Sequence, residues 1–394
     1  MMLYLFQYNF FLNFFNLIIA KKIYLCYIIW RLQHENHNFT EWKMKKFIAV
    51  LLILASSMLF AAEPYRVLVL GDLHYDSPDV RAGGKVKGVP RREMMRNVAA
   101  WKENIPAMLK AAALYANGNC LFSVQCGDLT QGDEGSYEMA VKSFNNALTI
   151  LKSGHNNPVY VVRGNHDVRG SGKAKASAAI KTFMQQYKEL KFSAHKDQVS
   201  YRMAGKDLFV FFDSQSGTAL ASLKEILAKV QNFRYMFVFS HLPIMPTISV
   251  SNWLCYRGKA ASQAELQALL AKHNAIVLAA HTHRSQVTYW KLPEGSVTQV
   301  ISFSIVSKIT ENFAVEEKSG AEHFKYIDEI ISRKKGAARE NIRKYLAPYR
   351  DKMVKKATFV ANGFNVLKIS DNGVEMDIFT GSDLSKPAGT LKLR

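Results

Sequence analysis

Cysteine is scarce in this chain of 394 residues, which contains four. Cys26 lies near the start, Cys120 and Cys126 flank a short apolar run, and Cys255 stands apart. No spacing among them matches a zinc site, and at most one disulfide can form among the last three. The sequence therefore excludes a small domain held together by disulfides and a domain built on a cysteine-ligated zinc ion.

Acidic residues are in the minority, with 32 Asp and Glu against 52 Lys and Arg, so the formal net charge is +20. A basic balance favours anionic partners such as phosphate esters, nucleic acid or acidic membrane surfaces. A solvated basic surface without a partner gives the same count. Hydrophobic residues make up 48% of the chain, which is enough for a substantial core and argues against disorder.

A short apolar run lies near the start of the chain. Lys45-Lys46 precedes Phe47–Phe60, and Ala61-Ala62 follows it. This order is typical of a signal peptide, and the run is short for a membrane span. We predict a signal peptide over residues 44–62 and an exported protein, periplasmic or extracellular, with no stable membrane insertion after cleavage. The alternative is an uncleaved anchor.

Residues 1–43 precede this complete export signal and are rich in Phe, Tyr, Asn, Ile and Leu. Our hypothesis is that translation starts at Met44 and that residues 1–43 are a misassigned extension. The competing interpretation is a real hydrophobic helix at Leu3–Ala20. In either case the folded domain is expected to cover residues 63–394.

From Tyr65 onward, short apolar runs rich in Val, Phe and Leu alternate with helical stretches, which predicts an α/β fold. We expect strands at Arg66–Leu70, Leu121–Gln125, Val159–Val162, Leu208–Phe212, Tyr235–Phe239, Ala275–Ala279, Val297–Val306, Asn365–Ile369 and Val374–Phe379. We expect helices at Arg91–Ala116, Tyr137–Lys152, Ala174–Leu190, Leu220–Gln231 and Ser262–Lys272, and a charged helical region over residues 320–356.

Polar clusters stand at the carboxyl ends of five of these strands. Active sites of α/β sheets gather at such ends. The clusters contain Asp72, His74, Asp128, Asn165, His166, Asp167, His241, His281 and His283. They include five of the nine histidines in residues 63–394, so histidine is concentrated where a site is expected.

The residue types in these clusters suit a pair of metal ions. Carboxylate, amide and imidazole groups together bind borderline cations such as Mn, Fe and Zn. Asp72 and His74 are two residues apart, so their side chains share one face of a strand, and the same holds for His281 and His283. Two metals about 3.5–4 Å apart need a bridging carboxylate. Asp128, which follows a glycine at a strand end, is the natural candidate.

These motifs differ in specificity. Gly-Asp, His-x-His and a single histidine at a strand end are each common without a function. Gly164-Asn165-His166-Asp167 is more specific, because a tight turn that exposes three polar groups has few structural uses. The presence of all five motifs in this order, each after an apolar run, strongly favours a functional site.

In this order the motifs resemble those of the calcineurin-like metallophosphoesterases. That pattern is Asp-x-His, Gly-Asp, Gly-Asn-His-Asp/Glu, His and Gly-His-x-His, and the resemblance covers roughly Tyr65 to Ser285. It implies a metallophosphoesterase-type four-layer sandwich, in which two mainly mixed β-sheets are flanked by helices. It also implies a dinuclear metal site and identifies residues 63–394 as a calcineurin-like phosphoesterase domain.

The resemblance assigns a role to each motif residue. One metal would be held by Asp72, His74, Asp128 and His283. The other would be held by Asp128, Asn165, His241 and His281. His166 would contact the substrate phosphate or protonate the leaving group, with Asp167 orienting it. Two divalent or mixed-valence ions of Mn, Fe or Zn would share a hydroxide that attacks phosphorus.

The sequence departs from the family pattern at several positions. Ala280 replaces a glycine, and Arg163 replaces a proline. Gln131 stands where purple acid phosphatases carry a tyrosine, which argues against that branch. Gly127–Thr130 looks more like the phosphodiesterase branch. Arg163, Arg169 and Arg284 lie near the motifs, and we expect them to be surface charges, with substrate binding as the alternative.

These features predict an exported hydrolase of phosphate esters that favours phosphodiesters over phosphomonoesters. Its partner would be a phosphate-ester substrate, with nucleotides among the candidates and nucleic acid less favoured. The alternatives are a secreted nuclease on the same site and a non-catalytic binding protein on the same scaffold. The sequence does not determine the oligomeric state.

Overall fold

The computed structural model describes residues 63–80, 91–134, 136–170, 173–195, 199–247, 260–302, 304, 311–333 and 336–394. The described residues belong to one compact unit, Ala62–Arg394. The expected extension at residues 1–43 and the signal peptide at residues 44–62 lie outside the described residues. Both therefore stay predictions.

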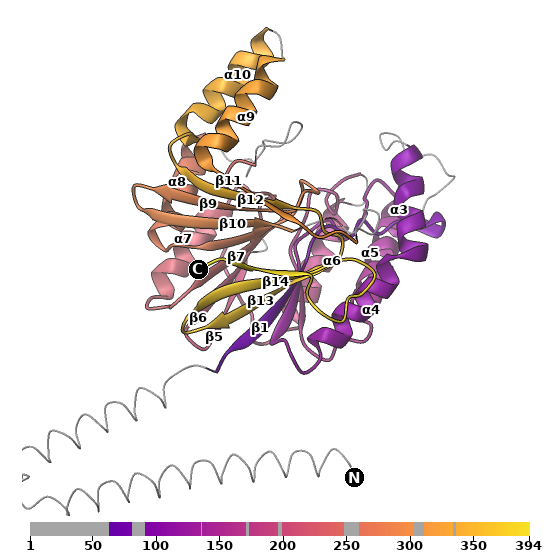
Figure 1. Cartoon of the computed structure of the whole chain (residues 1–394). Helices are drawn as coiled ribbons and strands as arrows, with labels where there is room; N and C mark the ends of the chain where they lie inside the picture. The colour runs from indigo at the N-terminus through magenta and orange to yellow at the C-terminus, as the bar shows by residue number, and fades with distance from the viewer. Residues whose placement is uncertain are drawn as a thin grey trace, which may run out of the picture. The chain divides into compact units, whose positions relative to one another are not determined.

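Six strands of the described residues form the first sheet, in the order β15-β14-β13-β1-β2-β3 (Figure 1). They are β1 (Tyr65–Leu70), β2 (Phe122–Gln125), β3 (Val159–Val161), β13 (Phe364–Ser370), β14 (Gly373–Phe379) and β15 (Gly389–Lys392). β1, β2 and β3 are parallel neighbours, so their carboxyl ends point to one edge, whereas β13 pairs antiparallel with β1.

The second sheet has the order β11-β12-β9-β10-β8-β7-β6-β5-β4. Its strands are β4 (Lys191–Phe192), β5 (Ser200–Ala204), β6 (Asp207–Phe212), β7 (Met236–Ser240), β8 (Ile276–Ala279), β9 (Gln286–Leu292), β10 (Gly295–Ile301), β11 (Val315–Ser319) and β12 (Met353–Phe359). β6, β7, β8 and β10 run parallel, and the other pairings are antiparallel.

Helices cover the two sheets. They are α3 (Arg91–Glu103), α4 (Ile105–Ala116), α5 (Tyr137–Lys152), α6 (Lys173–Gln185), α7 (Ala219–Lys229), α8 (Ala260–Lys272), α9 (Gly320–Ser332) and α10 (Ala337–Leu346). In Figure 1, α3 to α6 lie beside the first sheet, and α7 to α10 lie beside the second. No helix within the described ranges is long and apolar enough to cross a membrane.

The core follows from this layering. β6 is buried on both faces, so its alternate side chains enter two hydrophobic clusters. Phe209 faces the first sheet, where its ring packs edge-on against Phe122 with centroids 5.1 Å apart. Leu208, Val210 and Phe212 belong to the cluster that contains residues of α7 and α8. The expected α/β sandwich of two mixed sheets flanked by helices is confirmed.

Several sequence-based boundaries were wrong, among them the helix expected at Ala174–Leu190, which ends at Gln185. The single helix expected at Arg91–Ala116 is two helices separated at Asn104, because Pro106 lacks an amide hydrogen and fits only the first turn of a helix. The charged region at residues 320–356 is not helical throughout, since β12 begins at Met353. The strand expected at Val297–Val306 ends at Ile301, and residues 303 and 305–310 lie outside the described ranges.

Candidate metal centre and active site

Loops at the carboxyl ends of strands in both sheets carry the site. β1 is followed by Asp72 and His74, β2 by Asp128, β3 by Asn165, His166 and Asp167, β7 by His241, and β8 by His281 and His283. The backbone is in the left-handed region at four of these residues, with φ of +46° at His74, +53° at Asp128, +71° at His281 and +52° at His283. Non-glycine residues are strained in this region, and such strain concentrates at functional sites.

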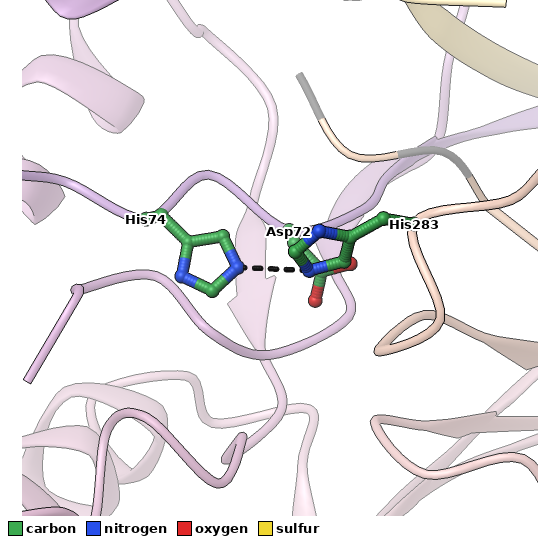
Figure 2. A group of neighbouring side chains, drawn as sticks. All are labelled: Asp72, His74 and His283. Carbon is green, nitrogen blue, oxygen red and sulfur yellow. Dashed lines mark hydrogen bonds and ion pairs between the residues drawn. The ribbon is translucent and has the colours of Figure 1, made fainter. Parts of the chain in front are cut away.

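Asp72, His74 and His283 form the first group of metal-ligating side chains. Figure 2 shows the rings of His74 and His283 turned toward each other beside the carboxylate of Asp72. The two Nε2 atoms are 3.0 Å apart, and His283 Nε2 lies 3.6 Å from Asp72 Oδ2. The backbone amide of His281 donates to Asp72 Oδ2 at 3.0 Å, which holds the carboxylate in place.

Asp128, His241 and His281 form the second group, and Asn165 joins it. His241 Nδ1 lies 3.0 Å from the carbonyl oxygen of Cys126. A carbonyl only accepts hydrogen bonds, so Nδ1 carries the hydrogen and Nε2 presents its lone pair. That Nε2 atom is 2.8 Å from Asn165 Oδ1 and 3.3 Å from Asp128 Oδ2. In the neutral ring, three electron donors thus converge without a hydrogen between them, and a cation bound there would replace the proton that Asp128 otherwise favours on Nε2.

Asp128 lies between the two groups. Its Oδ2 atom is 3.8 Å from His74 Nε2 and 3.3 Å from His241 Nε2. Its Oδ1 atom accepts a hydrogen bond of 2.7 Å from the backbone amide of His166. One oxygen is therefore fixed by the chain, and the other points toward ligands of both groups. This is the placement that a bridging carboxylate needs.

The electrostatics of the residues also fit a pair of cations. Asp72 and Asp128 are completely buried, and burial raises the pKa of Asp72. Burial acts in the same direction on Asp128, but His241, His166 and His74 outweigh it and hold the pKa of that carboxyl well below its usual range. Uncompensated buried carboxylates are costly. Bound metal ions would supply the missing positive charge.

Three histidines of the site are suited to ligation as neutral imidazoles, whereas Asp128 and Asp72 outweigh burial at His241 and raise its pKa to about 9. Burial lowers the pKa of His281 to about 3 and that of His283 to about 4. Burial also lowers the pKa of His74 well below the ordinary value. Only an uncharged imidazole nitrogen can bind a metal, so ligation at neutral pH has no proton to displace from these rings.

His166 is held by the backbone of a neighbouring loop. Its Nδ1 atom lies 2.7 Å from the carbonyl oxygen of Gln131, and its ring packs edge-on against His74 with centroids 4.6 Å apart. His166 also forms a third potential metal-ligating group with His74 and Asp128. Because Nδ1 donates a hydrogen bond to the carbonyl oxygen, Nε2 is the ring nitrogen that could exchange a proton with a substrate.

Asp167 holds the turn that carries His166. Its Oδ2 atom accepts from the amide of Gly164 at 2.8 Å, and its Oδ1 atom accepts from the amide of Thr130 at 3.0 Å. The hydroxyl of Thr130 lies 3.2 Å from the same Oδ1 atom. The carboxyl of Asp167 therefore ties the loop after β3 to the loop after β2, and it positions His166 through the turn.

Two glycines of the motifs are required by close approach. A Cβ atom at Gly127 would lie 2.7 Å from His241 Nδ1, and one at Gly164 would lie 2.1 Å from the backbone nitrogen of Asp128. Side chains at these positions would push apart the residues of the second metal-ligating group. The glycines in the Gly-Asp and Gly-Asn-His-Asp motifs thus have a packing role in the centre.

The arginines expected to be surface charges have different environments. Arg163 forms two hydrogen bonds to the buried carboxylate of Asp213, at 3.0 and 2.6 Å, so it is structural. Arg169 Nη1 lies 3.2 Å from His166 Nε2, and its Nη2 atom lies 3.0 Å from Asp133 Oδ2. Arg284 is exposed, as expected. The expectation was wrong for Arg163, and it missed the contact of Arg169 with His166.

Sequence reasoning also missed partners that act through backbone atoms. The carbonyl oxygens of Gln131 and Cys126 orient His166 and His241. Every residue has a backbone carbonyl, so the residue type does not reveal this role. The sequence position of these two residues relative to Asp128 was the signal that could have identified them. Gln131 is three residues after Asp128, and Cys126 is two residues before it, so both belong to the loop that follows β2.

A family model described as calcineurin-like phosphoesterase matches residues 65–285. No similar sequence was found among curated proteins. Solved structures with a related fold include a purple acid phosphatase from yellow lupin seeds, with 12% identity and a TM-score of 0.49, where the match covers 84% of this chain and 53% of that one. This chain thus spans about half the length of the lupin enzyme.

Two further structures match 84% of this chain. One is a dimetal phosphatase from Danio rerio, with 13% identity, a TM-score of 0.49 and all of that chain covered. The other is the anchor in the inner membrane complex of Plasmodium, with 13% identity, a TM-score of 0.44 and 89% of that chain covered.

Proposed function

Because the chain belongs to the calcineurin-like phosphoesterase family, we propose that it is an exported, metal-dependent hydrolase that prefers phosphodiesters to phosphomonoesters. One observation carries the proposal. The buried carboxylate of Asp128 faces His74 of one metal-ligating group and His241 of the other, while His166 packs beside His74. A place for two cations thus adjoins a histidine whose ring is held by the carbonyl oxygen of Gln131.

The ligand sets follow from the two groups. Asp72, His74 and His283 would hold one cation, and Asn165, His241 and His281 would hold the other, with Asp128 shared between them. Bound there, Mn, Fe or Zn would supply Lewis acidity and lower the pKa of a coordinated water. The chain's own contribution is to hold three of these ligands, Asp72, Asp128 and His241, through hydrogen bonds to backbone atoms.

His166 and Arg169 would act on the substrate. His166 Nε2 is placed to give a proton to the departing ester oxygen, while Gln131 keeps the hydrogen on Nδ1. The guanidinium of Arg169 beside that ring would contact a non-bridging phosphate oxygen. Asp167 would touch neither the substrate nor the His166 ring, and would act as a positioning residue.

The charge balance around His166 supports the preference for diesters. Arg169 is paired with Asp133 at 3.0 Å, so its positive charge is partly neutralised. A phosphodiester carries one negative charge, whereas a phosphomonoester carries close to two at neutral pH. The weaker positive field suits the diester better. The similarity of Gly127–Thr130 to the phosphodiesterase branch points the same way.

Export is supported by the order of residues 44–62, in which two lysines, an apolar run and two alanines precede Glu63. The substrate would then be a phosphodiester met outside the cytoplasm.

Hydrolysis of p-nitrophenyl phosphate and of bis(p-nitrophenyl) phosphate by the manganese-loaded protein tests the proposal. We expect the diester to be turned over with the higher kcat/KM. Faster turnover of the monoester would contradict the diester preference. No turnover of either would favour a binding protein on the same scaffold.

A further inference from the structure

A pocket of about 460 Å³ adjoins the metal centre at His283. Its walls come from the loop after β8, from β11 and β12 at the edge of the second sheet, and from α9. Figure 1 shows α9 next to β11 and β12. The residues that matter are Arg284, Lys318, His323 and Lys356. None of them belongs to the family motifs.

Positive charge is concentrated in this pocket. Lys356 of β12 is only 8% exposed, and Lys318 of β11 stands directly opposite it in the antiparallel register. Like charges directly opposite each other destabilise a strand pair. Arg284 adds a third cation. The pocket also contains the carboxylate of Glu316, which is exposed and pairs with Lys318 at 2.8 Å.

Two buried groups in the pocket have hydrogen-bonding capacity to spare. Lys356 forms no hydrogen bond or ion pair with the described residues, although buried lysines are nearly always paired. His323 is 3% exposed, and its Nε2 atom has no hydrogen-bond partner in the part of the chain that the structure describes. Burial, Arg284 and Lys318 lower the pKa of Lys356 to about 8. Burial, Lys356 and Lys318 likewise lower the pKa of His323 to about 3.

The neighbouring lysine shows that this arrangement is specific to the pocket. Lys355 points to the other face of β12, because side chains alternate along a strand. Its Nζ atom pairs with Glu317 at 2.8 Å and lies 5.2 Å from the ring centroid of Tyr289. The lysine outside the pocket is thus paired and half-exposed, whereas the lysine inside is buried and forms no ion pair with any residue that the structure describes.

We propose that this pocket is a second anion-binding subsite, which holds a phosphate or carboxylate on the part of the substrate that is not displaced. The inference rests on the proposed function, because the pocket touches the metal centre through His283. The preferred substrate would be a phosphodiester with a second anionic group. Lys356 and Lys318 would bind that group through charge-assisted hydrogen bonds, and His323 would offer a further polar contact.

A matched series of substrates tests this specificity. Each is a p-nitrophenyl alkyl phosphodiester with an alkyl chain of about three to six carbons, a span chosen to sample the pocket's length. The chain ends in a phosphate, a carboxylate or a hydroxyl group. Loss of one charge-assisted contact changes affinity by about tenfold or more, so we expect kcat/KM to favour an anionic end by at least that factor. The better of the two anionic ends identifies the group that the pocket takes.

Variants locate the preference within the pocket. In Lys356→Met and Lys318→Met, the ratio of kcat/KM between the anionic and hydroxyl ends should fall toward unity. Lys355→Met changes the adjacent, paired lysine and should keep the full ratio. No preference in the unaltered protein, or a preference that survives both pocket substitutions, would overturn the proposal.

A binding measurement separates this inference from the proposed function. Inorganic phosphate is titrated by calorimetry into full-length Asp128→Asn protein with a chelator present, so that the metal centre is disabled. If phosphate binds to Asp128→Asn but not to the double variant that also carries Lys356→Met, the subsite is supported even if no ester is hydrolysed. Absence of binding, or binding unchanged by Lys356→Met, overturns the subsite whatever the hydrolytic activity.

Discussion

His166 is oriented by Gln131: its Nδ1 atom lies 2.7 Å from the carbonyl oxygen of that residue. The carbonyl accepts a hydrogen bond, so the Nδ1 hydrogen is committed and a proton can be exchanged only at Nε2. Arg169 lies beside the same ring, 3.2 Å from Nε2. The contact with Gln131 thus leaves Nε2 as the nitrogen for the proposed role of His166, proton donation to the leaving group.

We predict that His166→Ala lowers kcat about 10²- to 10⁴-fold for a diester with an alkyl leaving group, which needs a proton to depart. The loss should be smaller with a p-nitrophenyl leaving group, which departs as a stable anion. Steady-state kinetics with both substrates check this. His195→Ala is the control, because His195 is exposed and lies near Glu225, outside the site.

Metal content measured on the same His166→Ala protein decides between two roles. The proton-donor role predicts that both metals are retained. Loss of one metal would instead make His166 a ligand, together with His74 and Asp128 of the third group.

Asp167→Ala should reduce both stability and turnover. The substitution leaves the amides of Gly164 and Thr130 without their acceptor, and each unpaired buried donor costs about 1–3 kcal/mol. Asp167→Asn keeps one carbonyl acceptor and should lose less. Thermal unfolding and kcat are the measurements. Full activity in an unstable Asp167→Ala protein would show that the turn does not position His166.

Lys356→Met should stabilise the protein by a few degrees in Tm at pH 7. The pKa of Lys356 is about 8 in the folded state and about 10.4 in an unfolded chain, so its charge is costly only when folded. The penalty is fully present below pH 8, and it fades as the pH rises from about 8 to 10.4. The Tm difference between the two proteins should therefore shrink between pH 7 and pH 9.5.

Lys355→Met is the control for this stability prediction, because it breaks an exposed ion pair with Glu317, and such pairs contribute little. A Lys356→Met protein that is less stable than the unaltered protein at pH 7 would mean that the lysine has a stabilising partner in the folded protein.

N-terminal sequencing of the native protein tests export and the start site together. We expect the mature chain to begin at or close to Glu63. Peptides from residues 1–43 would contradict the misassigned start, and an intact segment 44–62 would favour an anchored form.

Much of the fold was predictable from local patterns. Buried strands such as β1 and β7 are short apolar runs on both faces, and their polar ends mark the site. The edge of the second sheet was missed for a physical reason. β11 reads Val-Glu-Glu-Lys-Ser and is exposed, so it lacks the apolar signal, and its pairing with β12 depends on a partner more than thirty residues away.

The site was predictable where residue type carries the chemistry. The motif residues lie together in two metal-ligating groups with Asn165 beside them, and His166 and Asp167 are adjacent. The contacts that orient His166 and His241 were not predictable, because they are made by the backbone carbonyls of Gln131 and Cys126. The role of Lys356 was not predictable, because it is adjacent to Lys355 in a basic cluster of the sequence. In the structure, side chains alternate along β12, so Lys356 is buried in the pocket, whereas Lys355 is half-exposed and paired with Glu317.

The most direct test of the dinuclear centre is the metal content and diester turnover of the unaltered protein, of Asp128→Asn and of the control Asp79→Asn, which alters an exposed acid paired with Lys142. We predict two metal ions per chain in the unaltered and control proteins. Asp128→Asn should lose at least one ion and at least about a hundredfold in turnover, because Asp128 would serve both ions. An Asp128→Asn protein with two ions and undiminished turnover would contradict the account.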